Sequence, residues 1–296
     1  MSSYNVDMRA VILALPLLLA AWPTSAADPV AIVAAARSLQ PGELVVLTLT
    51  TTRPTDSLRV RAFGRDIPAF RVGSLTWRVL IGIDVDVAPG TYQVAIQARP
   101  DIDTTHSLIV RSKRFPTRVL RVDDAFVNPP TDVRDRIARE TNDLARLWSQ
   151  SAAERAWTGP FVPPVPDPVV SQFGTRSIFN GQRRNPHGGV DFLSMTGTPV
   201  KAPGAGRIVL ARDLYFSGDT VVIDHGLGLF SLLAHLSAID THEGDTVSAG
   251  QRVGRVGATG RVTGPHLHWA VRAGDARVDP FSVLAVLGTA TLNQTR

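Results

Sequence analysis

The sequence has 296 residues, of which 44% are hydrophobic and 19% are charged. This is the composition of a globular chain with one large or two ordinary domains, and it excludes disorder, collagen and a coiled coil as overall descriptions. The formal net charge is +5, and Arg supplies nearly all of the positive charge, because Lys113 and Lys201 are the only lysines. No cysteine is present, which excludes disulfides, thiolate metal ligands and a cysteine nucleophile. Any metal must therefore be held by His, Asp and Glu.

The first 27 residues have the pattern of a secretory signal peptide. Arg9 precedes an apolar run over residues 10–22, and small residues at 25–27 offer a cleavage site. The run is shorter than the ~20 residues that a membrane-spanning helix needs. We therefore predict a signal peptide over residues 1–27, export to the periplasm or the medium, and no stable membrane span after cleavage. An uncleaved anchor is the alternative, and initiation at Met8 would give a cleaner signal.

Residues 28–124 alternate short β-branched runs with turn residues. The strand candidates, in chain order, are residues 43–52, 57–63, 77–87 and 91–98. Alternation is clearest in the third run, where the apolar side chains at odd positions from 79 to 87 share one face. The pattern predicts a small β-sandwich of immunoglobulin-like type over residues 28–124. It contains no group of residues typical of a catalytic or metal-binding site, and His106 is expected to lie in a loop.

The apolar period changes in residues 125–168. Apolar or half-polar positions recur there at intervals of four and three residues, as in an amphipathic helix: Val133, Ile137, Thr141, Leu144 and Trp148. Five prolines then fall within residues 160–168. This density predicts a stiff extended connector rather than a packed element. We therefore predict a helix and a Pro-rich linker over residues 125–168.

Residues 169–290 again contain strand-like runs separated by Gly-rich turns. The clearest runs are residues 207–211, 220–224, 229–234 and 268–271. No long helix is indicated, so we predict a second, antiparallel β domain, and the fold class of the whole chain is all-β with one connecting helix. No basic stripe interleaved with aromatic residues occurs in this part, which argues against nucleic acid as a partner.

Histidines concentrate in the same part, where six of the seven lie after residue 180. Three fragments contain the candidate site: His187 with Asp191, His235 alone, and His266 with His268. In an extended chain, residues two or four positions apart face the same side, so each pair can converge. Two neutral imidazoles and one carboxylate form the three-protein-ligand set of a catalytic zinc with an open fourth position. Two further histidines would remain for proton transfer.

The motifs around these residues resemble one family. The chain has His-x-x-x-Asp at 187–191, Ala-His-Leu at 234–236 and His-x-His at 266–268. Together with Gly-Thr-Pro-Val at 197–200, these motifs are similar to the catalytic domain of lysostaphin/LytM-type zinc endopeptidases, which cut peptide bonds in bacterial peptidoglycan. The likeness covers about residues 169–281. More weakly, the N-terminal part resembles the layout of exported members that carry an immunoglobulin-like domain.

The resemblance implies one Zn²⁺ per chain, with His187, Asp191 and His268 as metal ligands and His235 and His266 as catalytic residues. His266 is then placed to accept a proton from the attacking water. His235 would stabilise the tetrahedral intermediate or protonate the leaving amine, and the division of roles between the two stays open. The implied activity is zinc-dependent hydrolysis of peptide bonds in peptidoglycan stem peptides or cross-links, with peptidoglycan as partner and other cell-wall proteins as further candidates.

Several neighbouring residues have smaller predicted roles. Arg183 and Arg184 precede the first metal fragment and are candidates for contacts with substrate carboxylates. His225 is expected to be structural, and His242 is expected to lie in an exposed turn. Leu233 stands where many relatives have Tyr, a change expected to affect substrate contacts rather than metal binding.

Two alternative functions are kept open. The first is a catalytically silent LytM-type wall-binding protein that activates another wall hydrolase; negligible zinc uptake would favour it. The second is a biotinyl or lipoyl carrier domain, suggested by residues 200–203 and 244–251, but Lys201 lacks the flanking residues of a modified lysine and carriers do not explain the histidines. The N-terminal domain is expected to dock on the wall, bind a partner or cover the cleft.

Overall fold

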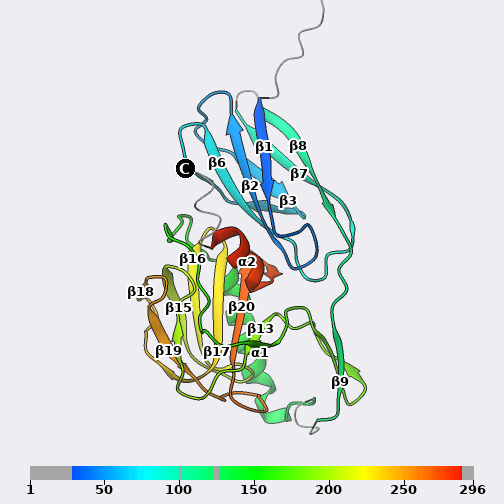
Figure 1. Ribbon diagram of the computed structural model, residues 1–296, viewed down its shortest axis with the longest axis vertical. Helices are drawn as coiled ribbons and strands as arrows, with labels where there is room; N and C mark the ends of the chain where they lie inside the picture. The colour runs from blue at the N-terminus through cyan, green and yellow to red at the C-terminus, as the bar shows by residue number, and fades with distance from the viewer. Residues whose placement is uncertain (1–28, 100–101, 123–126, 289–296) are drawn as a thin grey trace, which may run out of the picture.

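The computed structural model describes residues 29–99, 102–122 and 127–288. It is mostly β-structure in two parts, with a smaller two-sheet part at the top of Figure 1 and a larger sheet with both α-helices below it. The predicted all-β class is thereby confirmed. The predicted signal peptide lies outside the described residues. Within those three ranges, no helix is both long and apolar enough to cross a membrane.

Two four-stranded sheets form the N-terminal part. The first sheet has the order β1 (Val30–Ala35), β2 (Leu44–Thr51), β6 (Thr76–Gly82) and β5 (Ala69–Arg71). The second has the order β4 (Arg65–Ile67), β3 (Arg59–Ala62), β7 (Gly90–Ala98) and β8 (Ile102–Val110). Leu47 and Val79 of the first sheet share one buried core with Val60 and Ile96 of the second. The two sheets therefore face each other across a common core; the immunoglobulin-like type and the limits 28–124 stay predictions.

Two local predictions in this part are wrong. The strand expected over residues 77–87 ends at Gly82, because Asp84 begins a turn in which its side chain accepts from the Asp86 N–H at 3.0 Å. His106 lies in strand β8, opposite Val94, rather than in a loop. Alternation continues through a strand end into a turn, so the apolar pattern alone could not locate the end of the strand.

The C-terminal part is built on a ten-stranded sheet. Its main path runs β10 (Val169–Ser171), β13 (Gly189–Phe192), β20 (Leu267–Ala273), β17 (Leu229–Ile239), β16 (Gly218–Gly226), β15 (Gly206–Leu214) and β18 (Thr246–Val247). Three strands pair off this path: β14 (Pro199–Lys201), β19 (Arg252–Val256) and β21 (Ala276–Val278). In β20, Leu267, Trp269 and Val271 are buried in the core, whereas His268 and Ala270 alternate with them and face the other side.

Helix α1 (Arg134–Trp148) confirms the predicted amphipathic helix, and a 3₁₀ turn (Thr131–Val133) precedes it. Leu144, Leu147 and Trp148 of α1 pack against Phe230 of β17 and its neighbours in the sheet. A second helix, α2 (Pro280–Leu287), was not predicted. Asp279 caps it by accepting from the Phe281 N–H, and Pro280 stands in its first turn, so the Asp-Pro pair was a usable start signal.

The Pro-rich segment is packed, contrary to the prediction of an unpacked connector. Phe161 and Val165 are 2% and 3% exposed and belong to the core of the C-terminal sheet. The Phe161 N–H donates to the Leu287 carbonyl, and the Lys201 N–H donates to the Pro164 carbonyl. The prolines keep the segment extended, but the apolar residues between them place it along the core. The proline content indicated the extended conformation of the segment but did not indicate that the segment is buried.

The two parts meet over a packed interface. Leu44, Val46, Leu80 and Val85 of the N-terminal part belong to the same apolar cluster as the core of the ten-stranded sheet. Asp84 accepts two side-chain hydrogen bonds from Arg277 of β21, at 2.7 and 3.0 Å. The chain then leaves the sandwich through β9 (Thr117–Leu120), which pairs in parallel with β11 (Arg176–Phe179); β11 also pairs with β12 (Gln182–Arg183). Because of these contacts, the N-terminal part is held against one side of the sheet.

Candidate metal centre and cleft

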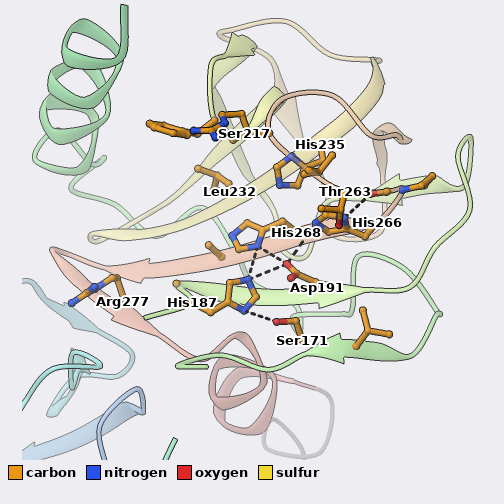
Figure 2. A pocket seen from close by; sticks show the side chains of 18 of the residues that line it. Ser171, His187, Asp191, Ser217, Leu232, His235, Thr263, His266, His268 and Arg277 are labelled. Atoms are coloured by element: carbon orange, nitrogen blue, oxygen red, sulfur yellow. Dashed lines mark hydrogen bonds and ion pairs between the residues drawn. The ribbon is translucent and has the colours of Figure 1, made fainter. Parts of the chain in front are cut away.

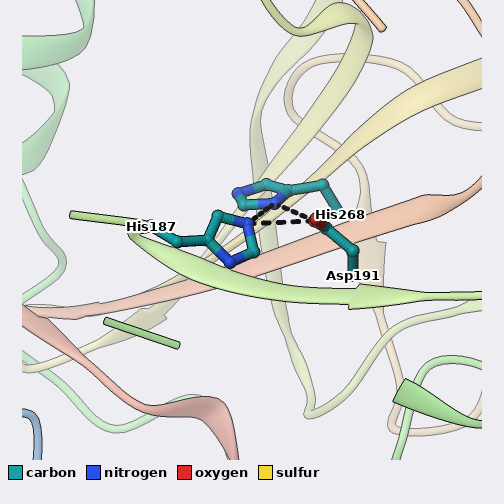
Figure 3. Close-up of side chains that lie close together, drawn as sticks. All are labelled: His187, Asp191 and His268. Carbon is teal, nitrogen blue, oxygen red and sulfur yellow. Dashed lines mark hydrogen bonds and ion pairs between the residues drawn. The ribbon is translucent and has the colours of Figure 1, made fainter. Parts of the chain in front are cut away.

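Three predicted ligands meet where β13 and β20 pair. Asp191 of β13 lies opposite His268 of β20, and His187 stands just before β13. The His187 Nε2 atom is 3.0 Å from Asp191 Oδ1 and 3.1 Å from His268 Nδ1, and His268 Nδ1 is 2.8 Å from the same carboxylate oxygen (Figure 3). The ligand atoms of all three residues lie within 4.8 Å of one another, in one group.

These donors fit a divalent metal. The His187 Nδ1 atom is 3.1 Å from the Gln172 carbonyl oxygen and 3.3 Å from Ser171 Oγ. Donation from Nδ1–H to the carbonyl leaves the lone pair on Nε2, the atom directed at Asp191 and His268. A backbone acceptor behind a ligating imidazole is the usual partner that fixes its tautomer and orientation. Two imidazole nitrogens and one carboxylate oxygen that converge in this way form the ligand set of a catalytic zinc site.

Protonation in the cluster also favours a cation. Burial raises the pKa of Asp191, but the close contacts with the His187 and His268 rings outweigh burial and hold that pKa well below its usual range. Burial lowers the pKa of His268, and the hydrogen bond to Asp191 opposes this change only in part. The carboxylate is therefore ionised and the His268 imidazole neutral near pH 7, which are the forms that bind a metal.

Local backbone features bring the two strands together. A Cβ atom on Gly189 would lie 2.3 Å from the Trp269 carbonyl oxygen, so the close approach of β13 to β20 requires glycine at this position. That approach sets Asp191 beside His268. The sequence showed Gly188 and Gly189 as residues that oppose a helix, and the structure adds that Gly189 is needed for strand pairing.

The two predicted catalytic histidines flank the ligands (Figure 2). His235 lies in β17, and its ring centroid is 4.8 Å from that of His266 and 6.1 Å from that of His268. The His235 Nδ1 atom is 3.0 Å from the Thr259 carbonyl oxygen, and the His266 Nδ1 atom is 2.9 Å from the Gly264 carbonyl oxygen. With both Nδ1 protons used in this way, the two Nε2 atoms are left for proton transfer. His266 Nε2 is 3.9 Å from Asp191 Oδ1.

His235 is held in an unusual conformation. Its φ of 63° lies in the left-handed region, which costs a non-glycine residue about 1–3 kcal/mol. The pairing of β17 is irregular around this residue, with register shifts between Asp219 and Val221 and between Leu236 and Ala238. Burial, together with the neighbouring histidines, lowers the pKa of His235 to about 4, so the ring is neutral at pH 7. The strained backbone turns the ring toward the ligands.

A cleft of about 820 Å³ surrounds this cluster. Its floor is the polar face of β13, β20 and β17, and its walls include Leu144 and Trp148 of α1 and the segment 261–265. Arg118, Leu120 and Val122, in and just after β9, form another wall. Among the described lining residues, the charged side chains are Asp191 and four arginines: Arg118, Arg261, Arg272 and Arg277. None of the described lining residues comes from the sandwich, residues 29–110.

The structure brings all five predicted site residues into this one cleft and leaves the other candidates outside it. Arg183 and Arg184 do not line it; Arg184 donates to the Val127 carbonyl oxygen instead. Leu233 is fully buried and pairs with Trp269 on the core side of the sheet, so it does not line the cleft. His225 is also buried, and its ring nitrogens contact the Ala205 carbonyl and the Ser231 hydroxyl.

Trp148 and Arg272 line the cleft and were not among the predicted residues. Arg272 follows His268 by four positions, the spacing that puts two side chains on one face of a strand. That signal was available in the sequence. No signal showed that α1 would bring Trp148 to the same face, because the contact joins elements far apart in the chain.

Comparisons with known proteins identify this β-sheet fold and its site as those of a peptidase. The profile described as peptidase family M23 matches residues 185–280. A crystal structure from Pseudomonas aeruginosa assigned to peptidase M23 shares 31% sequence identity and a TM-score of 0.66, over 85% of this chain and 96% of that one. This chain therefore belongs to peptidase family M23.

Curated relatives match about a third of the chain. Peptidoglycan DD-endopeptidase ShyA of Vibrio cholerae is 43% identical over 109 residues, which cover 34% of this chain and 25% of ShyA. DD-carboxypeptidase/endopeptidase Mpg of Neisseria meningitidis is 43% identical over 97 residues, covering 33% of this chain and 22% of Mpg. This chain thus spans about a quarter of the length of these two relatives.

Proposed function

We propose that this protein is an exported zinc endopeptidase that hydrolyses peptide bonds in peptidoglycan. The observation that carries the proposal is the convergence of His187, Asp191 and His268 on one point, with His235 and His266 beside them in an open cleft. Membership of family M23 supports peptidase chemistry. The names of the relatives ShyA and Mpg support peptidoglycan as the substrate, and the pattern of residues 1–27 supports export.

In this proposal, His187 Nε2, an Asp191 oxygen and His268 Nδ1 would hold one zinc ion. Zinc bound there supplies polarisation of the scissile carbonyl group and a lowered pKa for the attacking water. A single carboxylate among the three ligands keeps the site positively charged overall, which favours the negative charge that develops on the carbonyl oxygen.

In this proposal, His266 and His235 carry out the proton transfers. The hydrogen bond from His266 Nδ1–H to the Gly264 carbonyl leaves Nε2 as an acceptor beside Asp191, so His266 takes the proton of the attacking water. His235, whose Nδ1–H is held by the Thr259 carbonyl, faces the same space from β17. The Nε2 atom of neutral His235 is then a second proton acceptor, and the leaving amine takes the proton that one of the two histidines has accepted from the water.

The proposal is tested with purified protein, its metal content and isolated peptidoglycan. Wild type should bind about one zinc per chain and release cut peptides that mass spectrometry identifies. His187→Ala should lose both metal and hydrolysis, whereas His266→Ala should keep the metal and lose hydrolysis. His242→Ala is the matched control, because the His242 side chain is 92% exposed and lies outside the cleft; it should behave as wild type.

Two results would contradict the proposal. Hydrolysis at the wild-type rate by His266→Ala would remove that residue from the mechanism. Wild-type protein that binds peptidoglycan, takes up no zinc and releases no peptides would instead favour the catalytically silent wall-binding alternative.

A further inference from the structure

Strand β20 presents a second functional candidate, Arg272, on the side that faces the cleft. Side chains alternate along a strand, so His268, Ala270 and Arg272 point to the same side, and all three line the cleft. Arg272 is four residues beyond His268, which places it ~13 Å farther along the floor at ~3.3 Å per residue. An extended peptide lying along this strand and cut at the metal would reach Arg272 with a residue three or four positions from the cut.

Arg272 is held in place by an aromatic ring. The Arg272 guanidinium stacks on Trp148 of α1, 5.1 Å from the ring centroid, and Trp148 packs edge-on against Phe230 at 5.3 Å. The Arg272 Nη1 atom donates to the Asp275 carbonyl oxygen at 3.0 Å. A guanidinium has five N–H donors in a rigid fork, so most of its donors stay available to a ligand in the cleft.

The nearby carboxylates are already engaged by other arginines, since Asp275 pairs with Arg65 at 3.4 Å. Arg277 of β21 lies directly opposite Arg272 in the sheet, and it binds Asp84 at 2.7 Å and Asp86 at 2.8 Å. Figure 2 shows Arg277 at the end of the site away from His266. By contrast, no ion pair of Arg272 occurs within the described ranges of the chain. Arg272 and Arg277 are therefore adjacent in the sheet, but the carboxylates of Asp84 and Asp86 contact Arg277 only.

This arrangement has an electrostatic cost. Burial and the positive charge of Arg277 lower the pKa of Arg272, and the more distant charges of Asp84 and Asp275 oppose this change only in part. A partly buried cation without a carboxylate partner is unfavourable, and an anionic ligand would remove the penalty. Since Asp191 is the only acidic side chain among the described residues of the cleft lining, nothing else in the lining competes for Arg272.

We propose that Arg272, stacked on Trp148, is a specificity residue that binds a free carboxylate of the substrate peptide ~13 Å from the scissile bond. The inference rests on the proposed peptidase function and narrows its substrate to peptides with an anionic group at that distance. Leu144 and Trp148 form the cleft wall at this position, and the guanidinium fork matches a carboxylate in a bidentate contact. The carboxylate comes either from an acidic residue within the stem peptide or from its C-terminus.

The test compares three forms of one synthetic cross-linked stem peptide, with all carboxylates free, with only the C-terminal carboxylate amidated, or with only the internal acidic residue amidated. For wild type, kcat/KM should fall about tenfold to a hundredfold on one amidated form, which identifies the source of the carboxylate. Arg272→Gln should cleave all three forms at similar rates, close to that of wild type on the disfavoured form. Arg272→Lys should keep part of the preference, because it keeps the charge and loses the fork.

Each comparison is made within one enzyme, so a general loss of folded protein lowers all three rates together and leaves their ratio unchanged. Arg207→Gln, an exposed change on β15 outside the cleft, is the matched control and should keep the wild-type ratio. Equal cleavage of the three forms by wild type overturns the inference and leaves the proposed function standing. So does an Arg272→Gln variant with the full wild-type preference. No cleavage of any form by wild type overturns the proposed function itself.

Discussion

The two β-rich parts of this molecule use their sheets differently. In the N-terminal sandwich, two sheets face each other and their inner side chains fill one core. In the C-terminal part, one face of the ten-stranded sheet is core, whereas the other is only partly covered by α1 and carries Asp191, His268 and Arg272. The same alternation of side chains therefore yields a closed scaffold in one part and, in the other, an open cleft with polar residues among its apolar lining. The candidate site therefore lies on the sheet face that α1 covers only in part.

The largest expected effect on stability concerns the Pro-rich segment that leads into the large sheet. Phe161 packs edge-on against Trp157 and His225 in the core of the large sheet, with ring centroids 5.8 and 4.9 Å away. Replacing a buried Phe with Ala removes apolar burial and leaves a cavity, so Phe161→Ala should cost about 3–5 kcal/mol of unfolding free energy. Urea unfolding measures this change.

Pro163→Ala is the control for that measurement, because Pro163 is exposed in the same segment. Its effect should stay below about 1 kcal/mol. If the two variants were equally stable, the Pro-rich segment would be a connector after all, and it would belong to neither core.

A second difference between the parts is acid sensitivity. His225 is fully buried in strand β16 of the large sheet, and desolvation lowers its pKa from 6.5 to about 4. Between these two pH values the unfolded chain binds a proton that the folded chain does not, so the stability from His225 is complete above about pH 6.5 and is lost as the pH falls toward 4. Wild type should therefore lose about 2 kcal/mol more than His225→Gln between pH 7 and pH 4.5.

The measurement is unfolding free energy against pH for both proteins, with His242→Gln as the control for an exposed histidine. The comparison uses the slope and not the absolute stability, because His225→Gln also loses the contacts to Ala205 and Ser231. Parallel curves of unfolding free energy against pH for wild type and His225→Gln would show that His225 does not contribute to the loss of stability in acid.

A further expected effect, of similar or smaller size, concerns the interface that joins the parts. Asp84 binds Arg277 through two side-chain hydrogen bonds, and its side chain is 16% exposed. Asp84→Ala leaves Arg277 with only the more exposed Asp86, so we expect a loss of about 1–3 kcal/mol, between the values for exposed and buried pairs.

Asp86→Ala is the matched comparison, because the Asp86 side chain is 52% exposed; it should cost at most about 1 kcal/mol. Thermal unfolding of both variants measures the difference. A larger loss for Asp86→Ala than for Asp84→Ala would mean that the interface is organised differently.

Much of the fold and the site followed from local patterns. Period-two runs located the strands, period-3.6 spacing located α1, and the spacing of His187, Asp191, His266 and His268 indicated side chains that could converge. The family resemblance supplied the role of each residue, which spacing could not. These signals act over a few residues, where backbone geometry alone fixes which side chains share a face.

Contacts between distant segments could not be predicted in the same way. Arg277 and Asp84 are 193 positions apart, and Trp148 reaches Arg272 only because α1 packs on the sheet face that carries the site. The burial of Phe161 likewise depends on where the large sheet ends. The sequence indicates that such residues can be buried or charged, and only the assembled sheet shows which partners they meet.

The most direct test of the account is the location of zinc in a crystal of the zinc-loaded protein, from anomalous diffraction at the zinc absorption edge. The account predicts one strong peak ~2.0–2.2 Å from His187 Nε2, His268 Nδ1 and an Asp191 oxygen. A strong peak elsewhere, or no peak at these three atoms in fully loaded protein, would contradict it.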